Sequence, residues 1–364
     1  MKHLSLIICI WLSAPLIALP QNITTIPRDD RIKLVEQDPV KILMITGEEF
    51  DNFLKKSADN IKEYEKRLSG LKEKDADGYF KLAQWCKEKR LHKEAMLCLS
   101  KAIAAAPNHK GARELAGWKN ADGKWLRNYE LPANDIKYVD SSEEEKANSG
   151  DKGFETAKNF ITKNSNFIAV FKEIDAQLGL FRTPWEIEIG VGFTDKFPSH
   201  TYAITRPLGW NEKTGAYRLV VLLNTKYVNK ACSTGDTARM QRTIVHEFVH
   251  VLCTPATLMW QPLLLEGIAA FASGDPPISS KSLPPINEIK DIDTPAPNLG
   301  YAYIRGSAFF DFIKKKYSTD ILKKAVWNLV IERQSLSKAV SSAANADWSK
   351  IKAEELDYVK SLKK

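Results

Sequence analysis

The sequence predicts an α+β fold preceded by an all-α region, and three patterns carry that prediction. Residues 185–193 alternate strictly between apolar and other side chains, which is typical of a half-buried strand. Residues 217–223 form a more apolar run that predicts a second, more buried strand. Helical spacing dominates after residue 236, and strands followed by helices favour the α+β class.

Length and composition limit the function classes. The 364 residues are enough for about two domains. With 44% hydrophobic and 27% charged residues, the composition excludes a wholly disordered, collagen-like or multi-span membrane protein. The net charge is 53 − 45 = +8, but it is spread along the chain and no nucleic-acid-binding motif accompanies it. We therefore expect no nucleic-acid partner.

Residues 1–19 have the pattern of a signal peptide. A charged start at Lys2 is followed by 16 uncharged residues, Leu4 to Leu19, which is shorter than a comfortable transmembrane helix. We expect a secreted or periplasmic protein with no stable membrane span after signal removal. Leu16 stands where cleavage prefers a small residue, so an uncleaved membrane anchor is the alternative. Residues 20–48 predict an extended lead-in.

Residues 49–130 predict a helical region that resembles tetratricopeptide repeats. A 34-residue pattern over 76–109 puts small and large residues where two antiparallel helices need them. The matching residues are Tyr79, Leu82, Ala83, Cys86, Ala95, Leu99, Ala102 and Pro107. Only about one and a half repeats are present, and roughly three are needed to bury a solenoid core. The region is therefore expected to bind a protein partner or to form a helical cap on a catalytic domain.

Residues 131–153 predict a polar linker, and residues 154–364 a catalytic domain. A helix-like stretch lies near 154–180, before the two strands. The strand over 217–223 is either an edge that pairs with an extended substrate or an interior strand, as its apolarity favours equally. Four cysteines follow the signal peptide, too few for a disulfide framework, although one or two bridges are compatible with the sequence.

The chemistry is concentrated in His246-Glu247-Phe248-Val249-His250. Residues four apart lie on one face of a helix, so His246 and His250 are expected to direct two imidazoles at one metal ion. Glu247 is turned by about 100° from His246, within reach of a bound water. A pair of hydrogen-bonded core histidines is the alternative interpretation of the same spacing.

Glu266 supplies a third candidate metal ligand. It stands in the apolar run 263–271, where an unpaired carboxylate is costly to bury. Two histidines and one glutamate, with water in the fourth position, are typical of a catalytic zinc site. Cys253 is a less favoured ligand candidate, which we expect to belong to the core instead.

These motifs resemble the peptidase MA-like group of the gluzincin metallopeptidases. Glu266-Gly267-Ile268-Ala269 matches the second motif of that group, and Tyr303-Ile304-Arg305-Gly306 resembles the Tyr-x-Lys-Gly of related aminopeptidases. The resemblance implies a thermolysin-like catalytic domain, a Zn²⁺ cofactor, and a role for Tyr303 in stabilising the tetrahedral intermediate. The chain departs from those families because it has no substrate-gripping glutamate after Gly215-Ala216 and no carboxylate at Ala270.

The sequence thus predicts an exported zinc metallopeptidase acting on a peptide or protein. Glu247 is the expected general base toward a zinc-bound water, and His246, His250 and Glu266 are the expected metal ligands. Two alternatives stay open at this point. One is a non-catalytic scaffold of the tetratricopeptide type with a vestigial zinc site, and the other is a zinc hydrolase of non-peptide substrates.

Overall fold

The computed structural model describes residues 59–139, 146–197, 201–211, 213–254, 262–274 and 283–363. The predicted signal peptide and the lead-in over 20–48 lie outside these ranges. Within them the chain has the mixed α+β architecture expected from the sequence. None of the described helices combines the length and the apolar character that crossing a bilayer requires.

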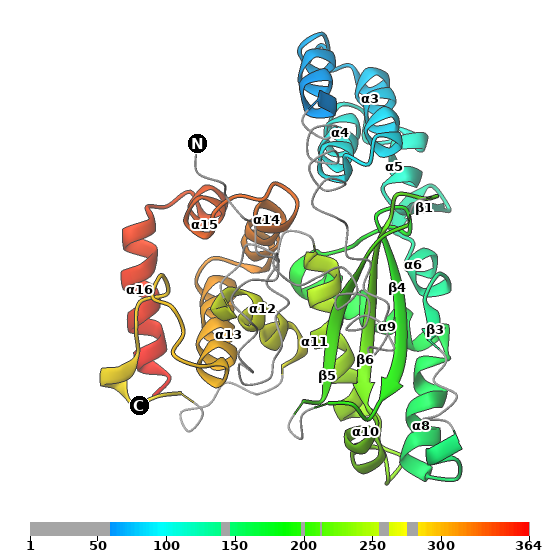
Figure 1. Ribbon diagram of the computed structural model, residues 1–364. Coiled ribbons are helices and arrows are strands. Elements are labelled where there is room, and N and C mark those ends of the chain that lie inside the picture. The colour runs from blue at the N-terminus through cyan, green and yellow to red at the C-terminus, as the bar shows by residue number, and fades with distance from the viewer. Residues whose placement is uncertain are drawn as a thin grey trace, which may run out of the picture.

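A helical hairpin forms the N-terminal part of the described chain (Figure 1). Its elements follow a helix over 59–69 and are α3 (Ala76–Glu88), α4 (His92–Ala105) and the short α5 (Lys110–Leu115). Ala83, Cys86, Ala95 and Ala102 are fully buried, so the small positions of the 34-residue pattern let α3 and α4 approach. All four described cysteines are free thiols.

The helical pattern stops after α5 and a β-hairpin follows. Strands β1 (Trp118–Ala121) and β2 (Lys124–Arg127) pair antiparallel around Asp122 and Gly123. Both turn residues have positive φ, 52° and 80°, as a two-residue hairpin turn requires. The prediction that 118–127 belongs to the helical region is therefore wrong, and the Asp-Gly pair is the hairpin signal that could have corrected it.

A four-stranded sheet with the order β3-β4-β6-β5 is the centre of the second part of the chain. Its strands are β3 (Lys137–Val139), β4 (Ile187–Thr194), β5 (Ala203–Trp210) and β6 (Tyr217–Asn224). β3 and β6 flank β4 in parallel, whereas β5 runs antiparallel to β6. Part of the segment expected to be a linker therefore forms α6 (Glu130–Asn134) and an edge strand.

The strand predicted over 217–223 is interior, because β6 lies between β4 and β5. The interpretation of that strand as an edge is therefore wrong. The edge facing the predicted site is β5, which was not predicted from the sequence. Pro207 and Gly209 interrupt its alternation, and the register with β6 shifts between those two residues.

Helix α11 (Ala238–Cys253) lies between the sheet and the C-terminal helices (Figure 1). Phe248 of α11 stacks on Phe167 of α9 (Asn164–Leu178), with ring centroids 5.4 Å apart. The helices that precede α11 are α8 (Lys152–Ile161), α9 (Asn164–Leu178) and α10 (Thr225–Ala231). Those that follow are α12 (Pro262–Ser273), α13 (Leu299–Lys316), α14 (Thr319–Val330), α15 (Leu336–Ala344) and α16 (Trp348–Ser361), with a 3₁₀ turn over Ile286–Glu288.

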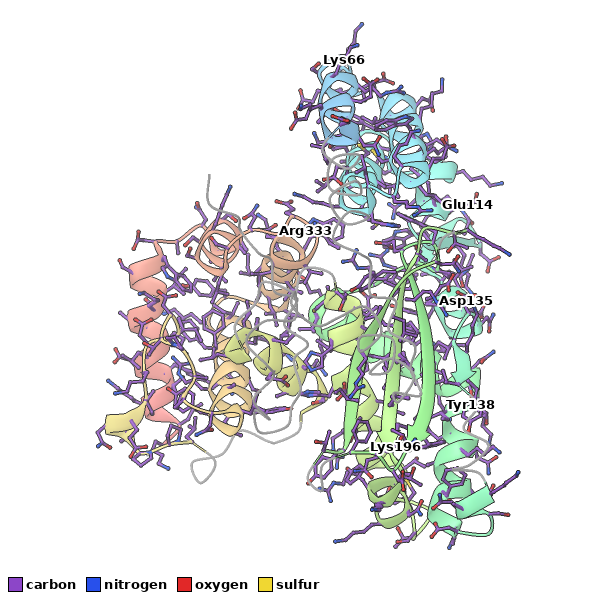
Figure 2. All side chains as sticks on the ribbon, in the orientation of Figure 1. Lys66, Glu114, Asp135, Tyr138, Lys196 and Arg333 are labelled. Atoms are coloured by element: carbon purple, nitrogen blue, oxygen red, sulfur yellow. The ribbon has the colours of Figure 1, made fainter. Side chains whose placement is uncertain are left out.

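Specific contacts fix the helical hairpin to the sheet. The Nε2 of His92 lies 3.0 Å from the carbonyl oxygen of Gly215, and its ring stacks on Trp185. The indole nitrogen of Trp185 donates to the carbonyl oxygen of Leu115 at 3.0 Å. Arg333, labelled in Figure 2 in the loop after α14, has Glu94 of α4 as an electrostatic neighbour. The hairpin is thus packed on the part of the chain that carries the predicted site.

Candidate metal centre

Helix α11 presents His246 and His250 on one face, as their spacing requires. The rest of the helix is enclosed, since Ile244, Val245 and Val249 are fully buried. Arg182 donates from Nε to the carbonyl oxygen of Leu252 at 3.1 Å, which satisfies a backbone group at the end of the helix. The core therefore fixes the direction in which the two imidazoles point.

Three donor atoms converge between α11 and α12. The Nε2 atoms of His246 and His250 are 3.1 Å apart, and Oε2 of Glu266 lies 3.2 Å from the first and 3.5 Å from the second. Ligands held about 2.0–2.2 Å from a tetrahedral zinc ion would be about 3.3–3.6 Å from one another. The three side chains are only 10%, 14% and 12% exposed. The sequence-predicted ligand set is thus brought together, and it can hold a metal ion.

The charges of the three side chains depend on one another. Burial opposes the ionised form of Glu266, but the neighbouring imidazoles of His250 and His246 hold its pKa below the ordinary value. Burial likewise disfavours the charged form of His250. The effect of the Glu266 carboxylate is larger than that of burial, so the pKa of His250 is raised. Among the described residues, the buried Nδ1 of His250 has no hydrogen-bond partner. Three atoms that can each offer a lone pair to a metal ion therefore meet at one point.

A close crossing of α12 and α13 sets the position of Glu266. A Cβ atom on Gly267 would overlap the backbone of Gly306, and one on Gly306 would overlap the carbonyl oxygen of Leu263. The glycine that follows Glu266 and the glycine of Tyr-Ile-Arg-Gly thus face each other across the crossing. Glycine is needed at both positions because the two backbones are in contact. The two motifs, which are separate in the sequence, form one packing unit.

Tyr303 reaches the cluster from α13. Its ring stacks on the imidazole of His246 with centroids 5.3 Å apart. Burial, followed by the charges of Glu266 and Glu247, raises the pKa of Tyr303. The phenol therefore remains a proton donor throughout the neutral range.

Glu247 is held by a residue that was not predicted from the sequence. The hydroxyl of Thr205 lies 2.7 Å from Oε2 of Glu247 and 3.1 Å from the carbonyl oxygen of the same residue. Glu247 is 7% exposed, so its carboxylate is fixed inside the site. Thr205 belongs to β5, and it was missed because that strand was not recognised.

Cys253 does not join the metal cluster. It is fully buried, and burial raises the pKa of its thiol to about 12. A protonated thiol is a poor zinc ligand, since zinc binds the thiolate. The core-packing interpretation of Cys253 therefore agrees with its surroundings.

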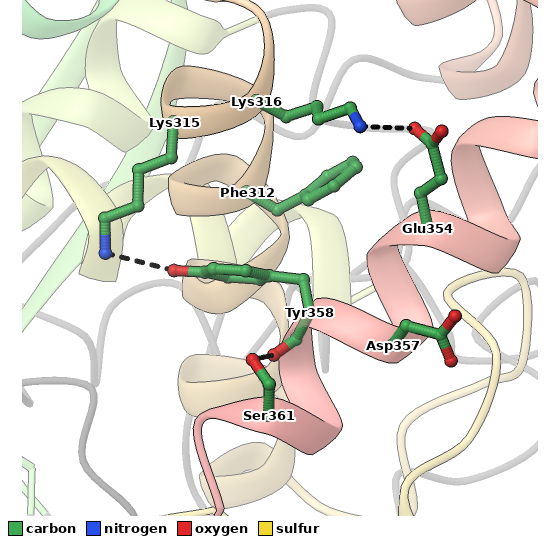
Figure 3. A pocket seen from close by; sticks show the side chains of 7 residues that line it. All are labelled: Phe312, Lys315, Lys316, Glu354, Asp357, Tyr358 and Ser361. Atoms are coloured by element: carbon green, nitrogen blue, oxygen red, sulfur yellow. Dashed lines mark hydrogen bonds and ion pairs between the residues drawn. The ribbon is translucent and has the colours of Figure 1, made fainter.

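An open cavity between α13 and α16 lies away from the cluster (Figure 3). The lining side chains are Phe312, Lys315, Lys316, Glu354, Asp357, Tyr358 and Ser361. Lys316 pairs with Glu354 at 3.4 Å, and Lys315 donates to the hydroxyl of Tyr358 at 3.1 Å. Phe312 is nine residues beyond Tyr303, about 13 Å along the helix. These polar groups satisfy one another, so the cavity has the character of an ordinary helix–helix groove.

Comparisons of the chain with protein-family models, with curated proteins and with solved structures find no match.

Proposed function

We propose that this protein is a zinc-dependent metallopeptidase. The observation that carries the proposal is the convergence of His246, His250 and Glu266 beside a buried general-base candidate, Glu247. A gluzincin-type, thermolysin-like catalytic part and export through the N-terminal segment belong to the same proposal. They rest on the sequence motifs described above.

Zinc suits the donor set better than the other common divalent metals. Two imidazole nitrogens and one carboxylate oxygen are typical of catalytic zinc, whereas calcium and magnesium prefer ligand sets made of oxygen alone. The donor–donor distances are close to those of a tetrahedral site. A zinc ion held there would supply Lewis-acid chemistry, polarising the scissile carbonyl and acidifying water in the site.

The side chains of the protein carry the proton transfers. Glu247 accepts a proton from the attacking water and delivers it to the leaving amine, the usual task of a carboxylate within hydrogen-bond reach. Tyr303 donates a hydrogen bond to the oxygen on which negative charge develops.

The edge of β5 supports a peptide as the substrate. Asn224 donates its backbone N–H to the carbonyl oxygen of Tyr202 at 2.9 Å, which identifies this as a hydrogen-bonded pair. Such pairs alternate along an antiparallel ladder, so the backbone groups of Ala203, Thr205 and Pro207 point away from β6. Within the described residues nothing pairs with that edge. An extended peptide can add there as a further strand, beside Glu247.

The proposal includes a role for the helical hairpin as a cap on the catalytic part. Its contacts through His92 and Trp185 favour a cap on the catalytic part. Binding of a protein partner by the same hairpin remains a second proposal, which rests on its resemblance to tetratricopeptide repeats.

The test is digestion of an unbiased peptide library by the purified full-length protein. We expect hydrolysis that a chelator abolishes and zinc restores. Glu247→Gln should lower the rate by about 10²- to 10⁴-fold, the range for losing a general base, while zinc remains bound. Glu354→Gln, on α16 and away from the cluster, is the matched control and should leave the rate unchanged.

Two outcomes would contradict the proposal. Hydrolysis that survives in Glu247→Gln would remove Glu247 from the mechanism. A zinc-loaded wild-type protein that cleaves no peptide would favour the scaffold, or a hydrolase of other substrates if esters are cleaved instead.

A further inference from the structure

We infer that Thr205 is the positioning residue of the general base, holding the Glu247 carboxylate in a single orientation. The inference rests on the proposed function for its catalytic meaning, but the contact stands on its own geometry. The Thr205 hydroxyl lies 2.7 Å from Oε2 of Glu247, well within the range of a strong hydrogen bond to a carboxylate.

The hydroxyl has one proton to donate and two acceptors nearby. The carbonyl oxygen of Glu247 is 3.1 Å away, whereas the carboxylate oxygen is nearer and charged. Hydrogen bonds to charged acceptors are about twice as strong as neutral ones, so the proton goes to Oε2. The other carboxylate oxygen, Oε1, is then the one left to take the proton from water.

The backbone of the same residue lies at the free edge of the sheet. Thr205 stands opposite Val221 of β6 in a non-hydrogen-bonded pair, so its N–H and C=O point outward. A peptide that pairs with β5 would contact the main chain of the residue that orients the base. Thr205 therefore couples the placement of an extended substrate to the placement of the group that activates water.

The test compares Thr205→Val with Thr205→Ser in the full-length, zinc-loaded protein. Valine keeps the β-branched shape of the strand residue and removes the hydroxyl, whereas serine keeps the hydroxyl. Thr156→Val, partly exposed on α8, is the matched control. Loss of a hydrogen-bond partner that orients a metal ligand typically costs about 10- to 100-fold in metal affinity or activity, and we apply the same range to the partner of the general base. We expect a fall of that size in kcat for Thr205→Val, with KM and zinc content little changed, and recovery in Thr205→Ser.

A second measurement does not depend on activity. Crystal structures of the wild type and of Thr205→Val should show one orientation of Glu247 in the first and a reoriented or multiple carboxylate in the second. An unchanged Glu247 in Thr205→Val would overturn the inference, as would a Thr205→Ser variant as slow as Thr205→Val. If Glu247 reorients but the wild type cleaves nothing, the positioning role holds and the peptidase proposal fails.

Discussion

Two buried clusters of ionisable groups lie on neighbouring helices, and they solve the problem of burial in different ways. Between α13 and α16, the Arg305 guanidinium binds both carboxylate oxygens of Glu355, with Nη2 to Oε2 at 2.6 Å. Its remaining donors reach the carbonyl oxygen of Lys290 at 3.3 Å. Both side chains are fully buried. Opposite charges and complementary donors thus meet within the protein.

In the cluster of His246, His250 and Glu266 the carboxylate instead meets two imidazoles, which can lose their protons near neutral pH and then offer lone pairs to a metal ion. Two imidazole nitrogens approach each other and a carboxylate oxygen within 3.5 Å. The comparison gives a criterion for separating a structural cluster from a functional one. A structural pair keeps a permanent donor beside its acceptor, whereas a ligand cluster combines groups that can all act as acceptors once a cation replaces their protons.

The largest effect is expected where the structural pair is broken. Arg305→Met leaves Glu355 buried without its partner and should lower the free energy of unfolding by about 3–5 kcal/mol, measured by denaturant titration. The double variant Arg305→Met, Glu355→Leu should regain much of that loss, because no unpaired charge remains.

An exposed ion pair between the same two helices provides the control. Lys316 and Glu354 are 3.4 Å apart and 50% and 29% exposed. Lys316→Met should therefore cost less than about 1 kcal/mol. Equal losses in Arg305→Met and Lys316→Met would show that burial does not distinguish the two pairs.

The second prediction concerns the ligand cluster. Zinc at 100 times its dissociation constant should stabilise the wild type by about 2.7 kcal/mol relative to the chelated protein. Glu266→Gln should lose most of that gain, since a ligand is missing. Glu247→Gln should retain the stabilisation by zinc, although it is the same chemical change at another buried glutamate. Isothermal titration and thermal unfolding with and without zinc measure the difference, and a zinc response lost equally in both variants would contradict the ligand assignment.

The smallest effect concerns His92, a buried histidine outside the cluster. Burial lowers the pKa of His92, which contacts the Gly215 carbonyl oxygen. The unfolded chain takes up a proton below pH about 6.5, before the folded protein does, so stability is lost as the pH falls through that value. Between pH 7.5 and 5.5 the loss is at most about 1.4 kcal/mol.

The matching variant for that measurement is His92→Gln, which keeps a donor and does not titrate. Denaturation at the two pH values, in chelator so that zinc release plays no part, should show a smaller loss in the variant than in the wild type. A loss of the same size would assign the pH dependence to other groups.

Short-range patterns predicted much of the fold and the metal cluster. The alternation over 185–193, the apolar run over 217–223 and the His-x-x-x-His spacing each depend on neighbours within one element, and the structure has strands at 187–194 and 217–224 and a helix at 238–253. Glu266 could be predicted as a ligand because a carboxylate is costly to bury in an apolar run unless a cation compensates its charge. The motif matches of Gly267 and Gly306 were visible too, but their mutual contact was not.

Features that depend on tertiary pairing were missed. Strand β5 contains a proline, a bulge and side chains of mixed polarity. It forms a strand because its backbone pairs with that of β6. Thr205 lies beside Glu247 because β5 pairs with β6, and no local sequence pattern indicates that pairing. The partner of Arg305 lies 50 residues away on α16, and no local pattern indicates it.

The free edge of β5 also bears on the solubility of the protein. An unpaired strand is a template on which other copies can stack, and proteins commonly protect such edges with proline or bulges. Pro207 has no amide hydrogen to offer outward, and the irregularity between Pro207 and Gly209 disturbs the ladder at that end. Both features make this edge poorly suited to nucleate an aggregate.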